Sequence, residues 1–217
     1  MYNLKRICLI IWVCLVLFST AADYNPANGQ LPDLVILSTN DRHSSFLGEP
    51  YPDYDPTNTG DGTMGGIARL KSAVDEIRAE NPNTLLFDAG DFMDGTMFVV
   101  AENGAADLNI MREVGYNAAC LGNHEFTYGP DGLAAILKSA KMPIIPLLSA
   151  NISFGAEKSD DALEALWGDS GDPSHHVYPS VVLTTESGVK VGVFGLLWVP
   201  VQPDRAEDER GRSSCLD

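Results

Sequence analysis

Short apolar runs alternate with amphipathic stretches along most of the chain from residue 34 onward. The apolar runs are rich in Leu, Val, Ile and Ala, and they lie at residues 34–39, 84–88, 117–121 and 142–151. Runs of this length, bounded by turn-forming residues, are typical of buried strands. Apolar side chains recur at helical spacing in the intervals between them, at residues 65–80, 105–114 and 129–141. The pattern therefore predicts four strands connected by three helices.

Strands that alternate with helices are typical of a mostly parallel sheet whose connections cross over it. Residues 154–174 are polar and irregular, and they predict at most one turn of helix, at 161–167. Two further strands are predicted within 177–199, joined by a turn at 186–188. We therefore expect an α/β fold, with a layered sheet and crossover helices.

The first 22 residues have the pattern of a secretory signal peptide. Lys5 and Arg6 precede an unbroken apolar run, and the small residues that follow offer a cleavage site after Ala22. An uncleaved anchor is the alternative, but the run is shorter than the roughly 20 apolar residues that a membrane span requires. We expect an exported protein, periplasmic or extracellular, with no stable membrane anchor after cleavage.

The rest of the chain is long enough for one domain. The 217 residues are 45% hydrophobic and 20% charged, which is typical of globular proteins. We expect residues 23–33 to form a turn-rich leader and residues 200–217 an unstructured tail. The folded domain is expected to span residues 34–199.

A strong negative charge limits the partners. The formal net charge is −16, which argues against nucleic acid because binding to a phosphate backbone requires a basic surface. A small phosphorylated substrate remains compatible, since bound metal ions can supply positive charge locally. The sequence leaves the oligomeric state undetermined.

Polar residues follow three of the predicted strands directly. The first strand is followed by Asp41 and His43, the second by Asp91, and the third by Asn123 and His124. Ligands of parallel α/β sheets bind at the carboxyl ends of the strands, so these residues are expected to converge. Carboxylate, imidazole and amide donors suit Zn, Mn or Fe, and the thiolates typical of structural zinc sites are missing here. The sequence therefore predicts a metal site.

Each of these residues also has a purely structural interpretation. Asp41 is compatible with a loop-capping carboxylate, His43 with a surface imidazole, and Asp91 with a turn cap after a glycine. Because these residues follow three consecutive strands, a shared metal site is favoured over separate structural roles for each of them. We expect Asp88 and Glu125, which lie beside the candidate ligands, to serve the fold.

Five motifs in this order resemble the calcineurin-like metallophosphoesterases. They are ILSTNDRH, GGIARL, LLFDAGDFMDGT, AACLGNHEFTYG and GVKVGVFGLL. Within that family, the chain is most similar to the exported branch that contains 5'-nucleotidases and 2',3'-cyclic phosphodiesterases. The resemblance covers nearly all of residues 34–199, and the GNHEF sequence with both upstream motifs is its most specific part.

The resemblance implies a phosphoesterase with two divalent metal ions and a nucleotide as its small phosphorylated substrate. By this resemblance, Asp41 and His43 bind the first metal, Asp91 bridges both metals, and Asn123 binds the second. His124 matches the catalytic histidine beside the reacting phosphate. Such a histidine can stabilise charge on the phosphate or protonate the leaving alkoxide.

The sequence departs from the family pattern in its C-terminal part. The family has further metal-binding histidines, including a closing Gly-His-x-His, whereas the only other histidines here are His175 and His176, expected in an exposed loop. The C-terminal nucleotide-binding domain is also missing, so we expect a truncated catalytic domain, incomplete at its C-terminus. There are two alternatives to an active phosphoesterase. One is an inactive fragment that binds metal weakly, and the other is an acidic exported protein that binds small ligands even in the presence of a chelator.

Overall fold

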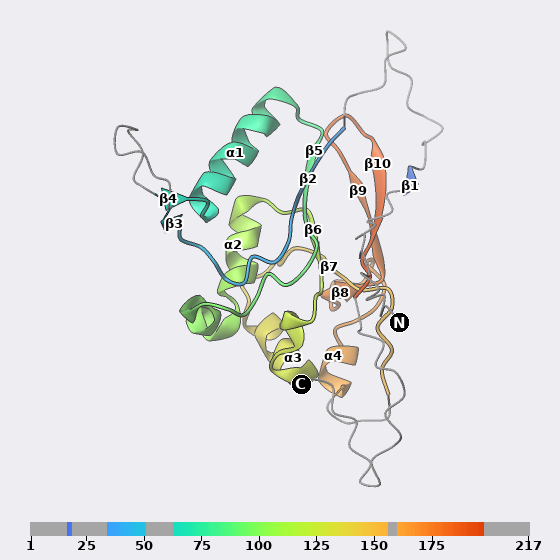
Figure 1. Cartoon of the computed structure of the whole chain (residues 1–217). Helices are drawn as coiled ribbons and strands as arrows, with labels where there is room; N and C mark the ends of the chain where they lie inside the picture. The colour runs from blue at the N-terminus through green and yellow to red at the C-terminus, as the bar shows by residue number, and fades with distance from the viewer. Residues whose placement is uncertain (1–16, 19–33, 51–62, 156–159, 198–217) are drawn as a thin grey trace, which may run out of the picture.

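A five-stranded sheet, a three-stranded sheet, a two-stranded ribbon and flanking helices make up the fold (Figure 1). The computed structural model describes residues 17–18, 34–50, 63–155 and 160–197. The strands are β1 (Leu17–Phe18), β2 (Val35–Thr39), β3 (Glu49–Pro50), β4 (Thr63–Met64), β5 (Thr84–Asp88), β6 (Ala118–Cys120), β7 (Leu147–Leu148), β8 (Val177–Tyr178), β9 (Ser180–Thr184) and β10 (Lys190–Phe194). The helices are α1 (Ile67–Glu80), α2 (Ala106–Val114), α3 (Gly129–Ser139), α4 (Asp161–Glu164) and the 3₁₀ helices η1 (Met97–Gly104) and η2 (His124–Phe126).

The five-stranded sheet has the order β2-β5-β6-β7-β8, and every neighbouring pair is parallel. Helix α1 connects β2 to β5, α2 connects β5 to β6, and α3 connects β6 to β7. The predicted α/β fold with crossover helices is therefore confirmed. Because β2, β5 and β6 are adjacent and parallel, their carboxyl ends lie at one edge of the sheet. The polar residues that follow these strands in the sequence are thus delivered to a common edge.

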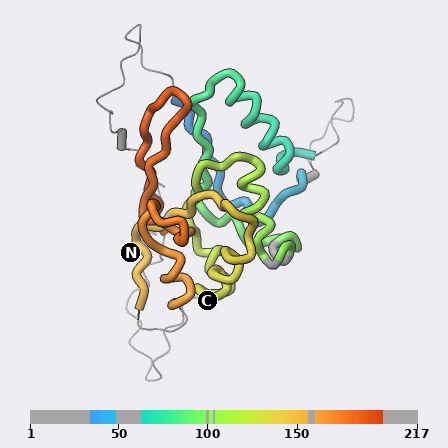
Figure 2. The backbone as a smooth tube through the Cα atoms, turned by 180° about the vertical axis from the view of Figure 1, so that it is seen from behind, coloured from blue at the N-terminus to red at the C-terminus, as the bar shows by residue number. Residues whose placement is uncertain are grey.

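Helices cover one face of the five-stranded sheet, and the β9–β10 hairpin covers the other (Figures 1 and 2). All five residues of β5 are buried, as expected for a strand covered on both faces. The core on the helix side includes Leu86, Leu108, Met111, Leu133 and Leu137. The core between the sheets includes Leu85, Phe87, Ala118, Val181, Val191 and Val193. Successive residues of β5 therefore contribute to two cores.

The structure differs from the sequence prediction around Pro179. One continuous strand is predicted before the turn at 186–188, but the chain forms two strands that belong to different sheets. Strand β8 extends the five-stranded sheet, and β9 pairs with β10 in the smaller one. Pro179 lies between them and has no main-chain N–H with which to continue a ladder, which explains the break. The strand predicted over 142–151 is likewise reduced to the two residues of β7.

The predicted signal peptide, leader and tail lie almost wholly outside the described residues. The exception is β1, in which Leu17 and Phe18 pair with Gly192 and Val191 of β10. Cleavage after Ala22 would remove this partner and leave that edge of β10 open. Within the described ranges, no helix is both long enough and apolar enough to cross a membrane.

Two glycines allow the ends of β5 and β6 to approach each other. A Cβ atom at Gly90 would lie 2.9 Å from the main-chain nitrogen of Gly122. A Cβ atom at Gly122 would overlap the carboxylate of Asp91 and would lie 2.6 Å from the Asp91 main-chain nitrogen. Contacts this short leave no room for a side chain. The glycine that precedes Asn123 is therefore required by the packing of Asp91 against the end of β6.

The buried carboxylate of Glu125 connects the loops that follow β5 and β6 through hydrogen bonds. Glu125 is 1% exposed. Its carboxylate accepts hydrogen bonds from the main-chain N–H groups of Gly122 at 2.6 Å, Met93 at 2.9 Å and Asp91 at 3.0 Å. Burial raises the pKa of Glu125 to about 7, and the charge of Asp91 adds to the increase, while the three N–H groups lower it. The expectation that Glu125 serves the fold agrees with these contacts.

The substitution Glu125→Gln should lower the free energy of unfolding by about 1–3 kcal/mol. The amide replaces one acceptor oxygen with a donor group, so at least one buried main-chain N–H loses its partner. Urea denaturation followed by circular dichroism measures the change. The matched control is Glu113→Gln on α2, where the side chain is 71% exposed and the change should stay within about 0.5 kcal/mol. Equal stability of the two variants would contradict the clamping role of Glu125.

The substitution Gly122→Ala should also destabilise the chain, by about 1–3 kcal/mol, because its methyl group would collide with Asp91. Gly171 provides the control, since a Cβ atom there has no atom within 4 Å and the Gly171→Ala variant should unfold like the wild type. Thermal unfolding of both variants tests the difference. A Gly122→Ala variant as stable as Gly171→Ala would show that β5 and β6 do not approach as closely as described.

Candidate active site

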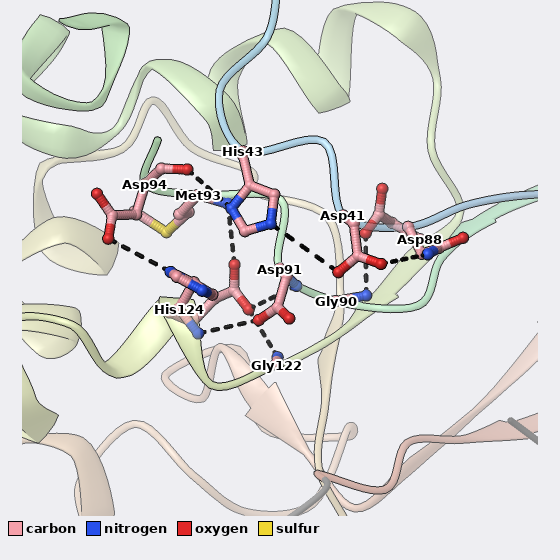
Figure 3. A network of polar contacts seen from close by, with 11 residues as sticks. Asp41, His43, Asp88, Gly90, Asp91, Met93, Asp94, Gly122 and His124 are labelled. Carbon is pink, nitrogen blue, oxygen red and sulfur yellow. Dashed lines mark hydrogen bonds and ion pairs between the residues drawn. The ribbon is translucent and has the colours of Figure 1, made fainter. Parts of the chain in front are cut away.

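The loop after β2 lies against the loop after β5. The Asp41 N–H donates to the Gly90 carbonyl at 3.0 Å, and the His43 N–H donates to the Asp91 carbonyl at 3.1 Å. From the opposite side, the main-chain N–H of His124 donates to Asp91 Oδ1 at 2.9 Å. Asp91 therefore lies between the loop that carries His43 and the loop that carries His124, as Figure 3 shows.

The backbone of these loops adopts left-handed conformations. Among the described residues, positive φ angles outside glycine occur at Asp41, His43, Ser44, Asp91, Asp94 and Glu102. All of these except Glu102 belong to the loops after β2 and β5. Such conformations cost about 1–3 kcal/mol each and concentrate at functional sites. The strain therefore falls on the loops that carry most of the predicted site residues.

The two predicted site histidines are in contact. The ring centroids of His43 and His124 lie 4.6 Å apart with an interplanar angle of 87°. His43 Nε2 lies 4.0 Å from Asp41 Oδ1. The side chains of His43 and His124 are 33% and 39% exposed, so both rings are open to solvent. The predicted convergence of these residues is thus observed.

Asp94 contacts both histidines, although the sequence carries no separate signal for it. Its main-chain carbonyl lies 3.1 Å from His43 Nδ1, and its carboxylate Oδ2 lies 3.4 Å from His124 Nδ1. The Thr127 hydroxyl donates to the same oxygen at 2.9 Å. The hydrogen bond from Thr127, followed by that from His124, holds the pKa of Asp94 below its usual value. Its only sequence signal is its place in the motif LLFDAGDFMDGT, three residues after Asp91.

A buried ion pair supports the base of the loop after β2. Asp88 is 2% exposed and accepts hydrogen bonds from Thr39 Oγ1 at 2.5 Å and Arg42 Nε at 2.9 Å. The guanidinium carbon of Arg42 lies 5.3 Å from the centre of the Tyr116 ring. Burial raises the pKa of Asp88, although Arg42 acts against the increase. Asp88 serves the fold, as expected, because it anchors the residue that lies between Asp41 and His43.

A second buried carboxylate holds the residue that follows His43. Asp107 on α2 is fully buried and accepts a hydrogen bond from the Ser44 hydroxyl at 2.7 Å. Burial raises the pKa of Asp107 to about 6, while the bond from Ser44 and the charge of Arg42 lower it. Helix α2 therefore helps to fix the left-handed segment that contains His43. No pattern in the sequence indicates this contact, since Asp107 lies 63 positions from Ser44.

The donor chemistry of the predicted site residues suits a divalent metal. Asp41 Oδ1 and His43 Nε2 lie 4.0 Å apart, which is wider than the roughly 3.4 Å that separates two ligands of one tetrahedral ion at about 2.1 Å. Asn123 is exposed at the start of η2. Across the part of the chain that the structure describes, no group of three or more His, Cys, Asp or Glu residues is arranged to hold a metal ion.

The remaining histidines lie away from the site. His175 and His176 precede β8, so they lie at the opposite edge of the parallel sheet. The expectation that they are exposed is wrong, because both are half-buried. The main-chain N–H of His176 donates to Leu166, and the His175 carbonyl accepts a hydrogen bond from the Tyr178 hydroxyl at 2.6 Å. Their contacts are with the segment around α4 and β8.

Comparisons with known proteins identify the family of this chain. The sequence profile of the calcineurin-like phosphoesterases matches residues 34–183, which is more than half of the chain. The 5'-nucleotidase of Homo sapiens is 45% identical over 121 residues, covering 55% of this chain and 20% of that protein. A probable 5'-nucleotidase of Treponema pallidum is 32% identical over 183 residues, covering 84% of this chain and 27% of that protein.

The similarity extends to solved structures. The crystal structure of a 5'-nucleotidase precursor from Thermus thermophilus matches with a TM-score of 0.56 and 30% identity, over 76% of this chain and 28% of that one. This chain therefore spans about a quarter of the length of these similar proteins. The profile match, the parallel sheet and the residues gathered at its edge lead to one conclusion: the chain belongs to the calcineurin-like phosphoesterase family.

Proposed function

We propose that the chain forms part of the active site of a two-metal phosphoesterase that hydrolyses phosphate esters of nucleotides. The observation that carries the proposal is the meeting of Asp41, His43, Asp91 and His124 at the ends of three adjacent parallel strands. Family membership supports the reaction class, and the similarity to 5'-nucleotidases supports a nucleotide as the substrate.

Four side chains would hold the metals. Asp41 and His43 would bind the first ion, Asp91 would bridge the two ions, and Asn123 would bind the second. The donors suit Zn, Mn or Fe. When bound, two such ions activate a water molecule and stabilise the attacking and leaving oxygens of an in-line displacement. The exposure of Asp41 and Asn123 leaves this edge of the sheet accessible to a substrate.

The protein's own contribution to catalysis centres on His124. Its ring is 39% exposed and lies against His43, so its free edge can meet a phosphate held at the same strand ends. From there the imidazole can donate a hydrogen bond to a phosphate oxygen or deliver a proton to the leaving alkoxide. Asp91 fixes the position of this residue, because its carboxylate accepts the main-chain N–H of His124.

Metal binding without turnover is a second candidate function. It is favoured by the lack of a three-residue metal group among the described residues, since an incomplete shell would bind ions weakly. Titration with Mn²⁺ in a calorimeter, together with an assay of AMP hydrolysis, separates the two functions. Binding with hydrolysis supports the phosphoesterase, and binding without hydrolysis supports the second candidate.

The substitution Asp91→Asn should reduce Mn²⁺-dependent hydrolysis of AMP at least about 100-fold, because a neutral amide cannot bridge two cations as a carboxylate does. Asp131→Asn, an exposed position on α3, is the matched control and should retain full activity. Circular dichroism should show both variants folded. Undiminished hydrolysis by Asp91→Asn would contradict the bridging role.

Export is part of the proposal and rests on residues 1–22. If the signal peptide is removed as the sequence predicts, the chain recovered outside the cytoplasm should begin at Asp23. N-terminal sequencing of the exported protein measures this directly. A chain retained in the cytoplasm with Met1 intact would contradict export.

A further inference from the structure

The side chain of Arg42 is buried, yet only one of its side-chain nitrogens has a hydrogen-bond partner. The side chain is 10% exposed, and Nε donates to Asp88 Oδ2 at 2.9 Å. Nη1 and Nη2 are buried and have no partner among the described residues. The Tyr116 ring, whose centre lies 5.3 Å from the guanidinium carbon, attracts the positive charge but offers no acceptor in the plane of these N–H groups. Arg42 therefore requires a further acceptor, because buried donors in folded proteins are almost always paired.

The carboxylate of Asp107 lacks a partner of the opposite kind. The residue is fully buried, and its Oδ2 atom accepts a hydrogen bond from the Ser44 hydroxyl at 2.7 Å. Its other oxygen, Oδ1, is buried and has no partner among the described residues. Four buried side-chain atoms are in this state across the part of the chain that the structure describes, and three of them belong to Arg42 and Asp107. Unpaired donors and an unpaired acceptor thus occur on two residues.

Both residues belong to one cluster beneath the loop after β2. Ser44, which contacts Asp107, is two positions from Arg42 in that loop. Tyr116, which lies against the guanidinium, is joined to α2 because its main-chain N–H donates to the Met111 carbonyl at 3.0 Å. Burial raises the pKa of Asp107, and the charge of Arg42 acts against the increase, as expected for neighbouring groups of opposite sign. The unpartnered atoms of the two residues nevertheless form no direct hydrogen bond with each other.

The chemistry of this cluster selects the molecule that can join the two residues. An anion could accept from Arg42, but it would lie beside the carboxylates of Asp88 and Asp107. A metal cation could bind Asp107, but it would lie against the guanidinium. A water molecule both accepts and donates hydrogen bonds and carries no charge, and buried water typically satisfies groups of this kind. Water is therefore the small molecule that matches both sets of unpaired atoms.

We propose that a buried water molecule binds between the guanidinium of Arg42 and Oδ1 of Asp107, and that it joins the loop after β2 to α2. The water accepts a hydrogen bond from Arg42 and donates one to Asp107. Asp107 then holds the residue that precedes His43 through the water, and it holds the residue that follows His43, Ser44, directly. The proposal concerns the support of this loop and does not depend on the proposed function.

High-resolution crystals of the full chain provide the first test. We expect density for one ordered water within about 3.2 Å of both an Nη atom of Arg42 and Oδ1 of Asp107. Crystals soaked in bromide or in rubidium should show no anomalous peak at this position. A direct ion pair between the two side chains, or a site without density, would overturn the proposal. A bromide peak would identify an anion site and a rubidium peak a cation site, and either would also overturn it.

A double-mutant cycle tests the connection in solution. Arg42→Met and Asp107→Leu should each lower the melting temperature, because each leaves the other residue's buried charge with one partner fewer. The double variant should lose less than the sum of the two, by about 2 °C or more. The control cycle pairs Arg42→Met with Asp131→Asn on α3, and its effects should add. If a single variant does not fold, Arg42→Lys and Asp107→Asn replace the pair. Additive effects of Arg42 and Asp107 would reject the connection.

Amide hydrogen exchange tests what the connection does for the loop. The N–H groups of His43 and Ser44 donate to carbonyls of the loop after β5. Arg42→Met and Asp107→Leu should each accelerate exchange at these two amides by about 3-fold or more relative to the amides of β9 and β10, since the loop would open locally more often. Equal acceleration in the loop and in the β9–β10 hairpin, or none in the loop, would contradict a role of this contact in holding His43.

Discussion

The geometry of this site depends on the hydrogen bonds that the buried carboxylate of Glu125 accepts. The carboxylate accepts three main-chain hydrogen bonds that join the end of β6 to the loop after β5. Because Gly90 and Gly122 have no side chains, the two strand ends can come close enough for this clamp to form. Asp91 is held between them, and the positions of the remaining site residues follow from its own.

The loops next to Glu125 contain left-handed backbone conformations that neighbouring contacts hold in place. Left-handed residues are costly, so they persist only where neighbouring contacts enforce them. Here the enforcement comes from the main-chain bonds between the loops after β2 and β5, and from two buried carboxylates, Asp88 and Asp107, beneath the first loop. The result is a rigid base that presents polar side chains at an accessible edge of the sheet. A preorganised edge of this kind suits the binding of metal ions and phosphate groups better than a mobile loop would.

The sequence predicts the parts of the structure that depend on local pattern. The alternation of strands and helices, the adjacency of the first three strands and the meeting of Asp41, His43 and Asp91 all follow from hydrophobic periodicity and the rules of parallel sheets. The roles of Asp94 and Asp107 are not predicted, because their partners come from distant segments, although Asp94 lies in one of the motifs that carry the resemblance. The break at Pro179 is also missed, since an apolar run gives no indication of which sheet its two halves join.

Family membership and site geometry support each other but answer different questions. Membership indicates phosphoester chemistry, whereas the geometry identifies the residues of this chain that could perform it. The described residues bring together carboxylates and imidazoles whose free atoms face a common, solvent-accessible edge. The side chains of His43 and His124 are 33% and 39% exposed, so both rings are accessible at this edge of the sheet.

Anomalous diffraction from crystals of the full chain grown with Mn²⁺ would test most directly whether these strand ends form a metal centre. We predict two anomalous peaks about 3.5–4 Å apart on either side of the Asp91 carboxylate, one of them in contact with Asp41 and His43. A folded chain without anomalous density at Asp91, or with manganese bound only elsewhere, would contradict the assignment of this edge as a metal centre.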